Sequence, residues 1–196
     1  MRAANLMGMA ANSGMSIDGW MGAAQRIDSP NADDRSVGEA ISLIVVHSIS
    51  LPPAEFGGDD IVRLFTNTLD PDAHPYFSGI SSLRVSAHFL IRRDGELTQF
   101  VSCLKRAWHA GLSSFNGREN CNDFSIGIEL EGCDDSPFED AQYVQLVALI
   151  KLIRTCFPID AVVGHSCVSP GRKTDPGPCF DWQRLAVFGA SLVRAL

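Results

Sequence analysis

The sequence predicts an α/β domain in which helices flank a mixed β-sheet. Three observations support this prediction. Apolar, β-branched runs alternate with amphipathic segments, and one strong hairpin signal adds an antiparallel pair of strands. No internal repeat or low-complexity linker divides the 196 residues. Hydrophobic residues make up 45% of the chain, which is ordinary for a domain that buries a core. We expect residues 15–196 to form this single domain. Residues 1–14 are expected to be a disordered extension, with Met15 as the natural start.

The first half of the chain alternates strand and helix signals. Residues 26–40 are rich in turn formers and charges, which indicates a surface loop. The apolar run 41–47 is typical of a buried strand, and the segment 59–67 has its apolar residues on one helical face. Residues 86–101 flank the dipeptide Asp94–Gly95, which favours a type I′ turn, so they predict a β-hairpin.

The second half repeats the alternation. Residues 124–132 alternate and end in glycine, as a strand does. Ser136 is the expected N-cap of the next helix, with proline at the first helical position and Glu139 closing a capping box. The short run 161–165 predicts another strand. After Asp181, a possible N-cap, we expect an amphipathic helix that reaches the C-terminus.

Charge, hydropathy and cysteine usage exclude several classes of protein. Lys and Arg number 16 and Asp and Glu 23, and the net charge of −7 argues against a phosphate-binding surface. No apolar run approaches the roughly 18 residues that span a bilayer, and the N-terminus makes a poor secretory signal. The cysteines contain no Cys-x-x-Cys pair, so we expect reduced thiols and a cytoplasmic location. The cysteines are Cys103, Cys121, Cys133, Cys156, Cys167 and Cys179.

Two histidines and an aspartate form a candidate metal site. His47 and His165 each end a predicted strand, and strand ends in a layered sheet meet in shared crevices. Asp175 lies in a stretch rich in Pro and Gly, which we expect to fold it back towards His165. Two imidazoles and one carboxylate, without a fourth protein ligand, suit a catalytic zinc ion that keeps one position for water.

Each histidine also has a purely structural interpretation. A single histidine at a strand end more often fills a core or rim position, and aspartate before proline usually belongs to a turn. We interpret His74, in PDAHP, and His88, in the predicted hairpin, as structural. His109, in AWHAG, is equally compatible with a ligand-contacting loop and with a structural hydrogen bond.

Five blocks of the sequence are similar to a known family. In chain order they are IVVHSISLPPAEFGG, LRVSAHFLIRRDGELTQFV, RAWHAG, CNDFSIGIELEG and GRKTDPGP. In these blocks the chain resembles the zinc-dependent N-acetylmuramoyl-L-alanine amidases, from about DGW at 18–20 to FDW at 180–182. The resemblance implies a mixed sheet flanked by helices, with zinc in a surface groove, and it also favours Met15 as the start.

The resemblance implies a role for each matching residue. It places the zinc ligands at His47, His165 and Asp175, and the general base or acid at Glu129. The transition-state stabiliser falls on Lys173. Without the resemblance, Glu129 could equally be a solvated strand-edge carboxylate and Lys173 an exposed loop lysine. Because related phage and animal members have cysteine at the third ligand, aspartate there indicates the branch that acts on 1,6-anhydro-muropeptides.

Substrate contacts are predicted more loosely, and each candidate could equally be structural. Arg84 could pair with a carboxylate of the muropeptide, since a guanidinium binds carboxylates through two parallel hydrogen bonds. Trp108 could stack on sugar or peptide. Backbone groups of Ala107 and His109 could hold the stem peptide, and Asn122 is a weaker candidate.

Three positions depart from the family pattern. Ser48 stands where the family usually has asparagine after the first zinc histidine. Cys167 stands where aspartate is frequent, and Asn120 replaces an arginine of some relatives. The departures concern the peptide end of the predicted site, where they would alter preference for the third peptide residue.

The resemblance implies zinc-dependent hydrolysis of the amide bond between (1,6-anhydro-)N-acetylmuramic acid and L-alanine of muropeptides. It places this reaction in cytoplasmic cell-wall recycling, with an indirect effect on β-lactamase induction. Two alternatives are a periplasmic murein amidase of the same fold, which would need an export signal, and a non-catalytic peptidoglycan-recognition module, which would lack a zinc ligand. We expect Zn²⁺ as cofactor, a small-molecule muropeptide as partner, a monomer, and no nucleic-acid or membrane partner.

Overall fold

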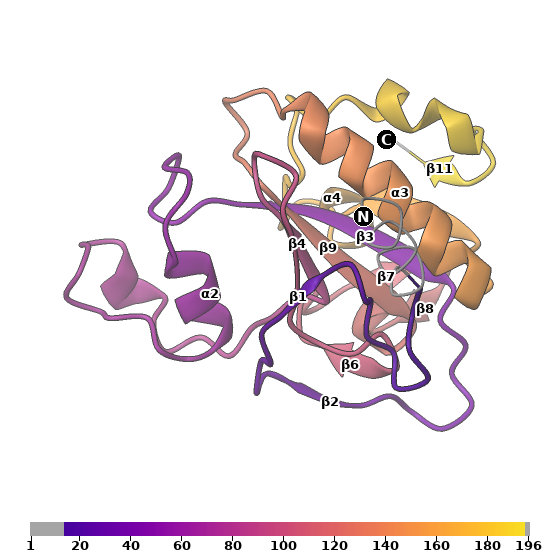
Figure 1. Ribbon diagram of the computed structural model, residues 1–196, viewed down its shortest axis with the longest axis horizontal. Coiled ribbons are helices and arrows are strands. Elements are labelled where there is room, and N and C mark those ends of the chain that lie inside the picture. The colour runs from indigo at the N-terminus through magenta and orange to yellow at the C-terminus, as the bar shows by residue number, and fades with distance from the viewer. Residues whose placement is uncertain (1–13, 195–196) are drawn as a thin grey trace, which may run out of the picture.

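A seven-stranded mixed sheet forms the centre of the computed structural model, which describes residues 14–194 (Figure 1). Neighbouring strands are parallel except for one antiparallel pair, β5 with β4. In order across the sheet the strands are β1 (Gln25–Arg26), β5 (Leu97–Gln99), β4 (Phe89–Ile91), β9 (Ser125–Glu131), β3 (Leu43–Ile49), β10 (Ala161–Gly164) and β11 (Val193–Arg194). The predicted fold class, an α/β domain with a mixed sheet flanked by helices, is confirmed.

The N-terminal extension predicted over residues 1–14 lies outside the described residues except for Gly14. The Gly14 carbonyl accepts a hydrogen bond from the Gly22 N–H at 3.1 Å, so the described chain is tied to the domain from its first residue. Within residues 14–194, no helix has both the length and the apolar character that a membrane span requires.

One face of the sheet is covered by α3 (Asp140–Cys156), which crosses the central strands in Figure 1. Leu146 and Ile150 of this helix lie one turn apart and are fully buried. They belong to the same apolar cluster as Ile44 and Val46, which alternate along β3 and therefore point to one face. The main core thus forms between α3 and one face of the sheet.

The opposite face of the sheet bears the polar residues of the candidate site. Val45 and His47 alternate with the core residues of β3, so they point away from α3. Gly127 and Glu129 occupy the corresponding positions of β9. The parallel register pairs His47 with Glu129, so these two side chains rise next to each other from neighbouring strands.

A second apolar cluster supports the segment that follows β3. The helix predicted over 59–67 is confirmed as α2 (Asp60–Phe65), which projects from the edge of the sheet in Figure 1. Its buried side chains pack with Leu90 of β4 and with Phe100. This cluster gives the long connection after β3 a core of its own, beside the candidate site.

The predicted start of α3 at Ser136 is wrong. Glu139 is the N-cap, and its N–H donates to the Gln142 side-chain oxygen at 3.0 Å. Phe138, just before the cap, is buried in the main core, so the chain stays extended until this ring is packed. Ser136 instead forms an isolated bridge with Cys133.

The predicted hairpin is confirmed, but its type I′ turn is wrong. Such a turn needs positive φ at both central residues, whereas Gly95 has φ 88° and Asp94 lies outside the left-handed region. The Gly95 N–H donates to the Arg92 carbonyl at 2.9 Å, and the Arg92 N–H donates to the Glu96 carbonyl at 2.9 Å. The loop therefore has three residues and ends in a left-handed glycine.

The predicted C-terminal helix begins after Asp181 as expected, but it does not reach the C-terminus. Asp181 is an N-cap whose carboxylate accepts from the Gln183 N–H at 2.9 Å. The helix it begins is a short 3-10 helix, η3 (Trp182–Phe188), which ends before Gly189 at φ 75°. The chain then pairs with the edge strand β10 as β11. This pairing gives the backbone N–H and C=O groups hydrogen-bond partners that the expected helix would otherwise have supplied.

The segment predicted as the loop 26–40 contains a strand. This strand, β2 (Ala32–Asp34), pairs antiparallel with β6 (Lys105–Ala107). Asn31 beside it is buried and donates from its side chain to the Phe65 and Val85 carbonyls, which the sequence pattern did not indicate. The remaining short elements are β7 (Ser114–Phe115), β8 (Arg118–Glu119), α4 (His165–Val168), η1 (Phe77–Gly79) and η2 (Cys121–Asp123).

Candidate functional site

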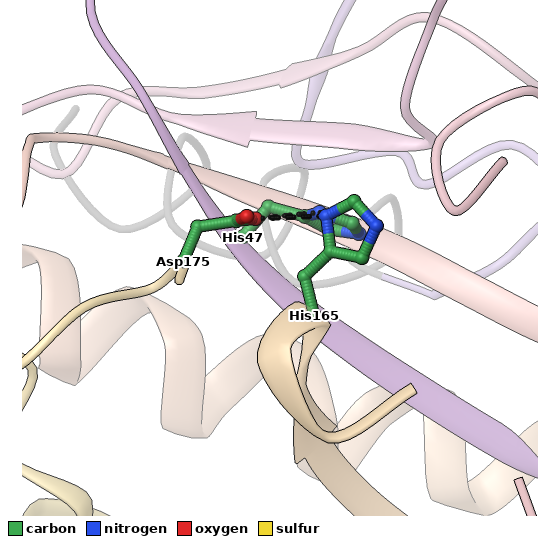
Figure 2. A group of neighbouring side chains, drawn as sticks. All are labelled: His47, His165 and Asp175. Carbon is green, nitrogen blue, oxygen red and sulfur yellow. Dashed lines mark hydrogen bonds and ion pairs between the residues drawn. The ribbon is translucent and has the colours of Figure 1, made fainter. Parts of the chain in front are cut away.

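The structure brings His47, His165 and Asp175 to one point (Figure 2). The two Nδ1 atoms lie 3.0 Å apart, and each lies 3.0 Å from Oδ2 of the aspartate. Both histidines are buried, at 1% and 3% exposure, while the aspartate is partly exposed. Three ligand-type atoms therefore form a nearly equilateral triangle at the edge of the interior.

The parallel pairing of β3 with β10 brings the two histidines together. Val46 is in register with Gly164, so the next residues, His47 and His165, lie at the same level. His165 follows the end of β10 as predicted, whereas His47 lies inside β3, which continues to Ile49, so its predicted place at the strand end is wrong. A Cβ on Gly164 would lie 2.8 Å from Cδ of Pro176, so only glycine allows the aspartate-bearing loop to approach this closely.

The loop after α4 folds back onto its own beginning. The Ser166 N–H donates to the backbone carbonyl of Asp175 at 3.0 Å, which holds the carboxylate beside His165. Arg172 donates to the Ala110 and Leu112 carbonyls, so the loop is also fastened to the neighbouring segment. The predicted return of the Pro- and Gly-rich stretch is observed.

The donor set fits a tetrahedral cation with one position left open. Zinc at its usual distance of about 2.0–2.1 Å from nitrogen would hold tetrahedral ligand atoms about 3.3–3.4 Å apart, close to the observed triangle. The Nε2 atom of His165 lies 3.1 Å from the Ala110 carbonyl, which can only accept, so this nitrogen is protonated. With its proton on Nε2, His165 can present the lone pair of Nδ1 to a cation, as a metal ligand must.

The charge states of two members of the triangle, Asp175 and His47, suit a metal site. Oδ2 of Asp175 lies 3.0 Å from both Nδ1 atoms, and an aspartate carboxyl is ordinarily ionised at neutral pH. Burial lowers the pKa of His47 to about 4, despite the opposing effect of the aspartate. At neutral pH the aspartate is ionised and His47 is uncharged, which suits both for binding a cation.

Glu129 stands beside this triangle with one oxygen unpaired. Its side chain is 8% exposed, and Oε2 is buried without a hydrogen-bond partner. Burial and then the charge of Asp175 raise its pKa well above the usual range, while Lys173 opposes the shift. A carboxyl group with a raised pKa holds a proton more readily than an ordinary glutamate, so it can act as an acid as well as a base.

A cleft of about 310 Å³ opens over these groups. Its floor contains the triangle and Glu129, and the exposed Lys173 stands at its rim. The other wall is mostly apolar and comes from the long connection after β3. That wall contains Leu51, Leu64, Phe65, Tyr76, Ile80, Leu83 and Val85. The cleft thus has a floor of polar, titratable groups and one apolar wall that could hold a bulky ligand.

The substrate residues predicted from the sequence separate into two groups. Trp108 and His109 line the cleft. Ala107 is fully buried in β6, and the Asn122 side chain accepts hydrogen bonds from the backbone N–H of His109 and of the next residue. Neither Ala107 nor Asn122 lines the cleft. Arg84 is exposed outside the cleft lining and donates to carbonyls of its own loop.

Of the three departures from the family pattern, one lines the cleft and two do not. Ser48 lines the cleft directly after His47. Asn120 has a left-handed backbone, with φ 58°, at the start of η2, and Cys167 lies in α4; neither lines the cleft. All six cysteines fall within the described residues, and none of them forms a disulfide there. Ser48 is therefore the departure that can touch a ligand directly.

The apolar wall was missed in the sequence. Its residues are scattered through the segment between β3 and β4 at no regular spacing, and the pattern reveals only α2. His88, interpreted as structural, is buried and accepts from the Gly127 N–H at 3.0 Å, which agrees with that interpretation. His109, for which the sequence left a ligand-contacting loop and a structural hydrogen bond equally open, contacts His47.

Comparison with known proteins identifies the architecture. Residues 37–178 match the family model described as N-acetylmuramoyl-L-alanine amidase. The 1,6-anhydro-N-acetylmuramyl-L-alanine amidase AmpD of Citrobacter freundii is 60% identical over 169 residues, 85% of this chain and 90% of that protein. A crystal structure of a selenomethionine derivative of AmpD superposes with a TM-score of 0.86 at 58% identity, covering 88% of this chain and 97% of that chain. The amidase AmiD of Escherichia coli, solved with anhydro-N-acetylmuramic acid-L-Ala-D-γ-Glu-L-Lys, has a TM-score of 0.56 at 30% identity over 79% of this chain and 60% of that chain.

Proposed function

The chain belongs to the N-acetylmuramoyl-L-alanine amidase family, and on that premise we propose that it is a zinc-dependent amidase of 1,6-anhydro-muropeptides. The proposed reaction hydrolyses the amide bond between the lactyl group of anhydro-N-acetylmuramic acid and L-alanine. The observation that supports it most strongly is the triangle of His47, His165 and Asp175, which lines one cleft together with Glu129, whose buried Oε2 has no hydrogen-bond partner.

The triangle is the proposed zinc site. Bound there, zinc would polarise the scissile carbonyl and lower the pKa of a water molecule to about 7. His47 and His165 supply neutral nitrogens and Asp175 one negative charge, which leaves a net positive centre able to do this. The complete ligand set also argues against a purely binding role, since a recognition module needs no metal.

Glu129 is the proposed proton carrier. Its raised pKa lets it accept a proton from the attacking water and then deliver that proton to the nitrogen of the departing alanine. Its position supports the assignment, because it rises beside His47 from the neighbouring strand and lines the cleft. The buried Oε2 has no protein partner that would compete for this proton.

Lys173 is the proposed stabiliser of the oxyanion. Its ammonium group is exposed at the rim of the cleft, two residues before the aspartate ligand. A positive charge there favours the negative oxygen that develops in the transition state more than the neutral carbonyl of the substrate. The neighbouring Arg172 fastens the loop to the Ala110 carbonyl, which supports a fixed position of the lysine backbone at this rim.

The Lys173→Met variant is expected to lose about 10²–10³ in kcat, the usual effect of removing one oxyanion stabiliser. Zinc content should stay unchanged, because the lysine is not a ligand. Steady-state kinetics with metal analysis checks this, and Lys105→Met serves as control because Lys105 forms an exposed ion pair with Asp34 away from the cleft. A variant with full kcat, or with a rise in KM alone, would contradict the role.

The proposed substrate is the soluble anhydro-muropeptide of cytoplasmic cell-wall recycling, with an indirect effect on β-lactamase induction. The relatives named for this activity support the proposal, as does the complex of AmiD with an anhydro-muramyl tripeptide. The lack of disulfides among the six cysteines of the described chain agrees with a reducing compartment. We also propose that the protein acts as a monomer, without a nucleic-acid or membrane partner.

Product analysis by mass spectrometry tests the proposal directly. The purified protein, incubated with anhydro-N-acetylmuramyl-L-Ala-D-γ-Glu-L-Lys, should release the free tripeptide and the anhydro sugar. Intact murein should yield little product in a parallel incubation. Equal release from murein would favour the periplasmic murein amidase, and binding of the muropeptide without any release would favour the recognition module.

A further inference from the structure

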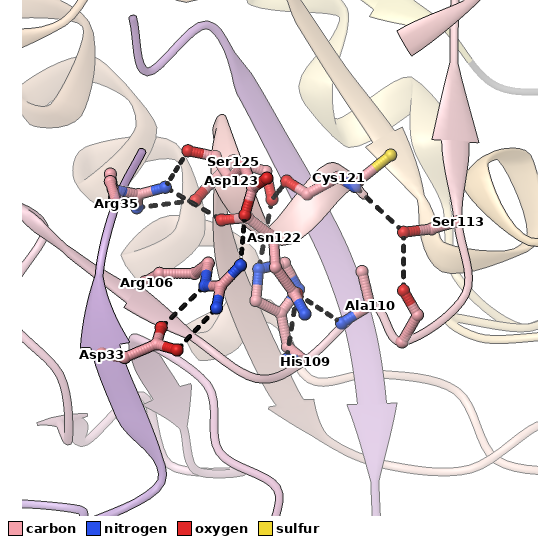
Figure 3. Close-up of polar contacts among 11 residues, drawn as sticks. Asp33, Arg35, Arg106, His109, Ala110, Ser113, Cys121, Asn122, Asp123 and Ser125 are labelled. Atoms are coloured by element: carbon pink, nitrogen blue, oxygen red, sulfur yellow. Dashed lines mark hydrogen bonds and ion pairs between the residues drawn. The ribbon is translucent and has the colours of Figure 1, made fainter. Parts of the chain in front are cut away.

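A line of hydrogen bonds runs from the proposed ligand His47 into the protein, on the side away from Asp175. The His47 Nε2 atom lies 2.9 Å from Nδ1 of His109. On the far side of that ring, Nε2 of His109 lies 3.2 Å from the Ser125 hydroxyl. The hydroxyl lies 2.5 Å from the Cys121 carbonyl oxygen. Figure 3 shows His109 reaching towards Ser125, with Cys121 beyond it.

The donor and acceptor of each hydrogen bond in this line can be worked out from the Cys121 carbonyl, at the end away from His47. A carbonyl oxygen only accepts, so Ser125 uses its single hydroxyl proton on Cys121. Ser125 is then the acceptor for His109, whose proton must lie on Nε2. A neutral imidazole has one N–H, so Nδ1 of His109 is an acceptor.

The same reasoning extends to the ligand. Because Nδ1 of His109 accepts, His47 must donate to it from Nε2. Its own Nδ1 is then unprotonated and faces Asp175 and His165. We propose that Ser125 and His109 form a relay that fixes the tautomer of His47, so that its lone pair points into the metal site. His109 is thus a positioning residue, and this inference rests on the proposed ligand role of His47.

The surroundings of His109 hold the ring in this one orientation. A Cβ on Gly127 would lie 2.4 Å from Cγ of His109, so the ring fills space that only glycine leaves on β9. The Asn122 side chain accepts from the His109 N–H at 3.2 Å and from the next N–H at 2.8 Å, which fixes the backbone.

Loss of the relay has a specific consequence for the metal site. Without an acceptor at position 109, the N–H of His47 is left in the interior with no partner, which is costly. Moving the proton to Nδ1 lets it hydrogen-bond to Asp175 instead. That proton then occupies the space where the cation must bind, so metal affinity falls although all three ligands remain.

Imidazole tautomers can be measured directly by long-range ¹H–¹⁵N spectra of protein labelled with ¹⁵N-histidine. In the zinc-free parent at pH 8, we expect His47 and His109 to carry their protons on Nε2. In His109→Leu, His47 should carry its proton on Nδ1. In His109→Asn, whose side-chain oxygen can replace the lost acceptor, the Nε2–H form of His47 should return.

Zinc affinity, measured by competition with a chromogenic chelator, gives a second readout. His109→Leu should bind zinc about 10–100-fold more weakly, and His109→Asn should recover part of the loss. His88→Leu is the matched control for the loss of a buried imidazole. His88 packs edge-on against the His109 ring, but the hydrogen-bond partners of its ring among residues 14–194 are Gly127, Arg35 and Lys105 rather than His47. That variant should keep the parent affinity even where its thermal stability falls.

The result that would overturn the inference is an Nδ1–H tautomer of His109 in the parent, or unchanged zinc affinity in His109→Leu. Equal losses of affinity in His88→Leu would also overturn it, since the effect would then be general destabilisation. Because the tautomers are measured without zinc and without substrate, a protein that shows the expected tautomers but binds no zinc would contradict the proposed function alone.

Discussion

Replacing Glu129 by glutamine is expected to lower kcat by about 10²–10⁴ while zinc and muropeptide binding persist. Glutamine keeps the shape of the side chain but can neither take a proton from water nor return it to the leaving nitrogen. The loss should appear in kcat, because the proposed role places the carboxyl at the reacting atoms. Steady-state kinetics, with calorimetry of muropeptide binding to the variant, checks both parts.

The control for this variant is the other buried glutamate of β9. Glu131 points to the same side of the strand two residues later, and it binds Arg92 at 3.1 Å and the Gly57 N–H at 2.7 Å. Glu131→Gln should therefore destabilise the fold and leave kcat nearly unchanged. A Glu129→Gln variant with parent kcat, or a Glu131→Gln variant with the larger loss of kcat, would contradict the assignment.

The raised pKa of Glu129 also predicts the sign of its effect on stability. Burial makes the folded protein hold this proton more tightly than the unfolded chain does. The free energy of unfolding therefore falls as pH rises from the unfolded pKa, about 4.3, to the folded one. Glutamine never ionises, so the zinc-free Glu129→Gln protein should melt at a higher temperature than the parent at neutral pH. The Glu129→Gln substitution is thus expected to lower kcat and to raise the melting temperature.

The Asp175→Ala variant is expected to lose both metal and activity. Removing the one anionic ligand leaves two neutral nitrogens, and two ligands rarely hold zinc in competition with water. If zinc supplies roughly 4 kcal/mol of transition-state stabilisation, the rate falls by about 10³. Metal content by atomic emission, measured on the same sample as the kinetics, checks both effects.

Asp181→Ala is a suitable control for the loss of a carboxylate. Asp181 caps η3 through the Gln183 N–H, so its removal should cost about 1 kcal/mol of stability without touching the metal site. We expect its zinc content and kcat to match those of the parent. Stoichiometric zinc in a folded Asp175→Ala protein would exclude the aspartate as a ligand.

The sheet and the metal triangle could be predicted because their signals are local. A run of β-branched residues identifies β3 whatever surrounds it, and alternation identifies β9. His47 and His165 sit at the ends of such runs, so the meeting of parallel strands brings them together. The role of Glu129 came from the family resemblance, since alternation alone fits Glu131 equally well.

The features that escaped prediction depend on contacts between distant segments. The start of α3 shifts from Ser136 to Glu139 because Phe138 must first reach the core, and no local signal encodes that packing. The C-terminal helix gives way to β11 because an open sheet edge lies within reach. The importance of His109 likewise depends on a ring nitrogen meeting His47 across 62 residues of sequence.

The most direct test of the account is peptide release from anhydro-N-acetylmuramyl tripeptide by protein stripped with a zinc chelator and then given zinc again. We predict that release stops on stripping and returns with stoichiometric zinc, with circular dichroism showing that the fold persists throughout. Release at the parent rate by protein that atomic emission shows to be free of metal would contradict the central claim. So would a folded, zinc-loaded protein that releases no peptide.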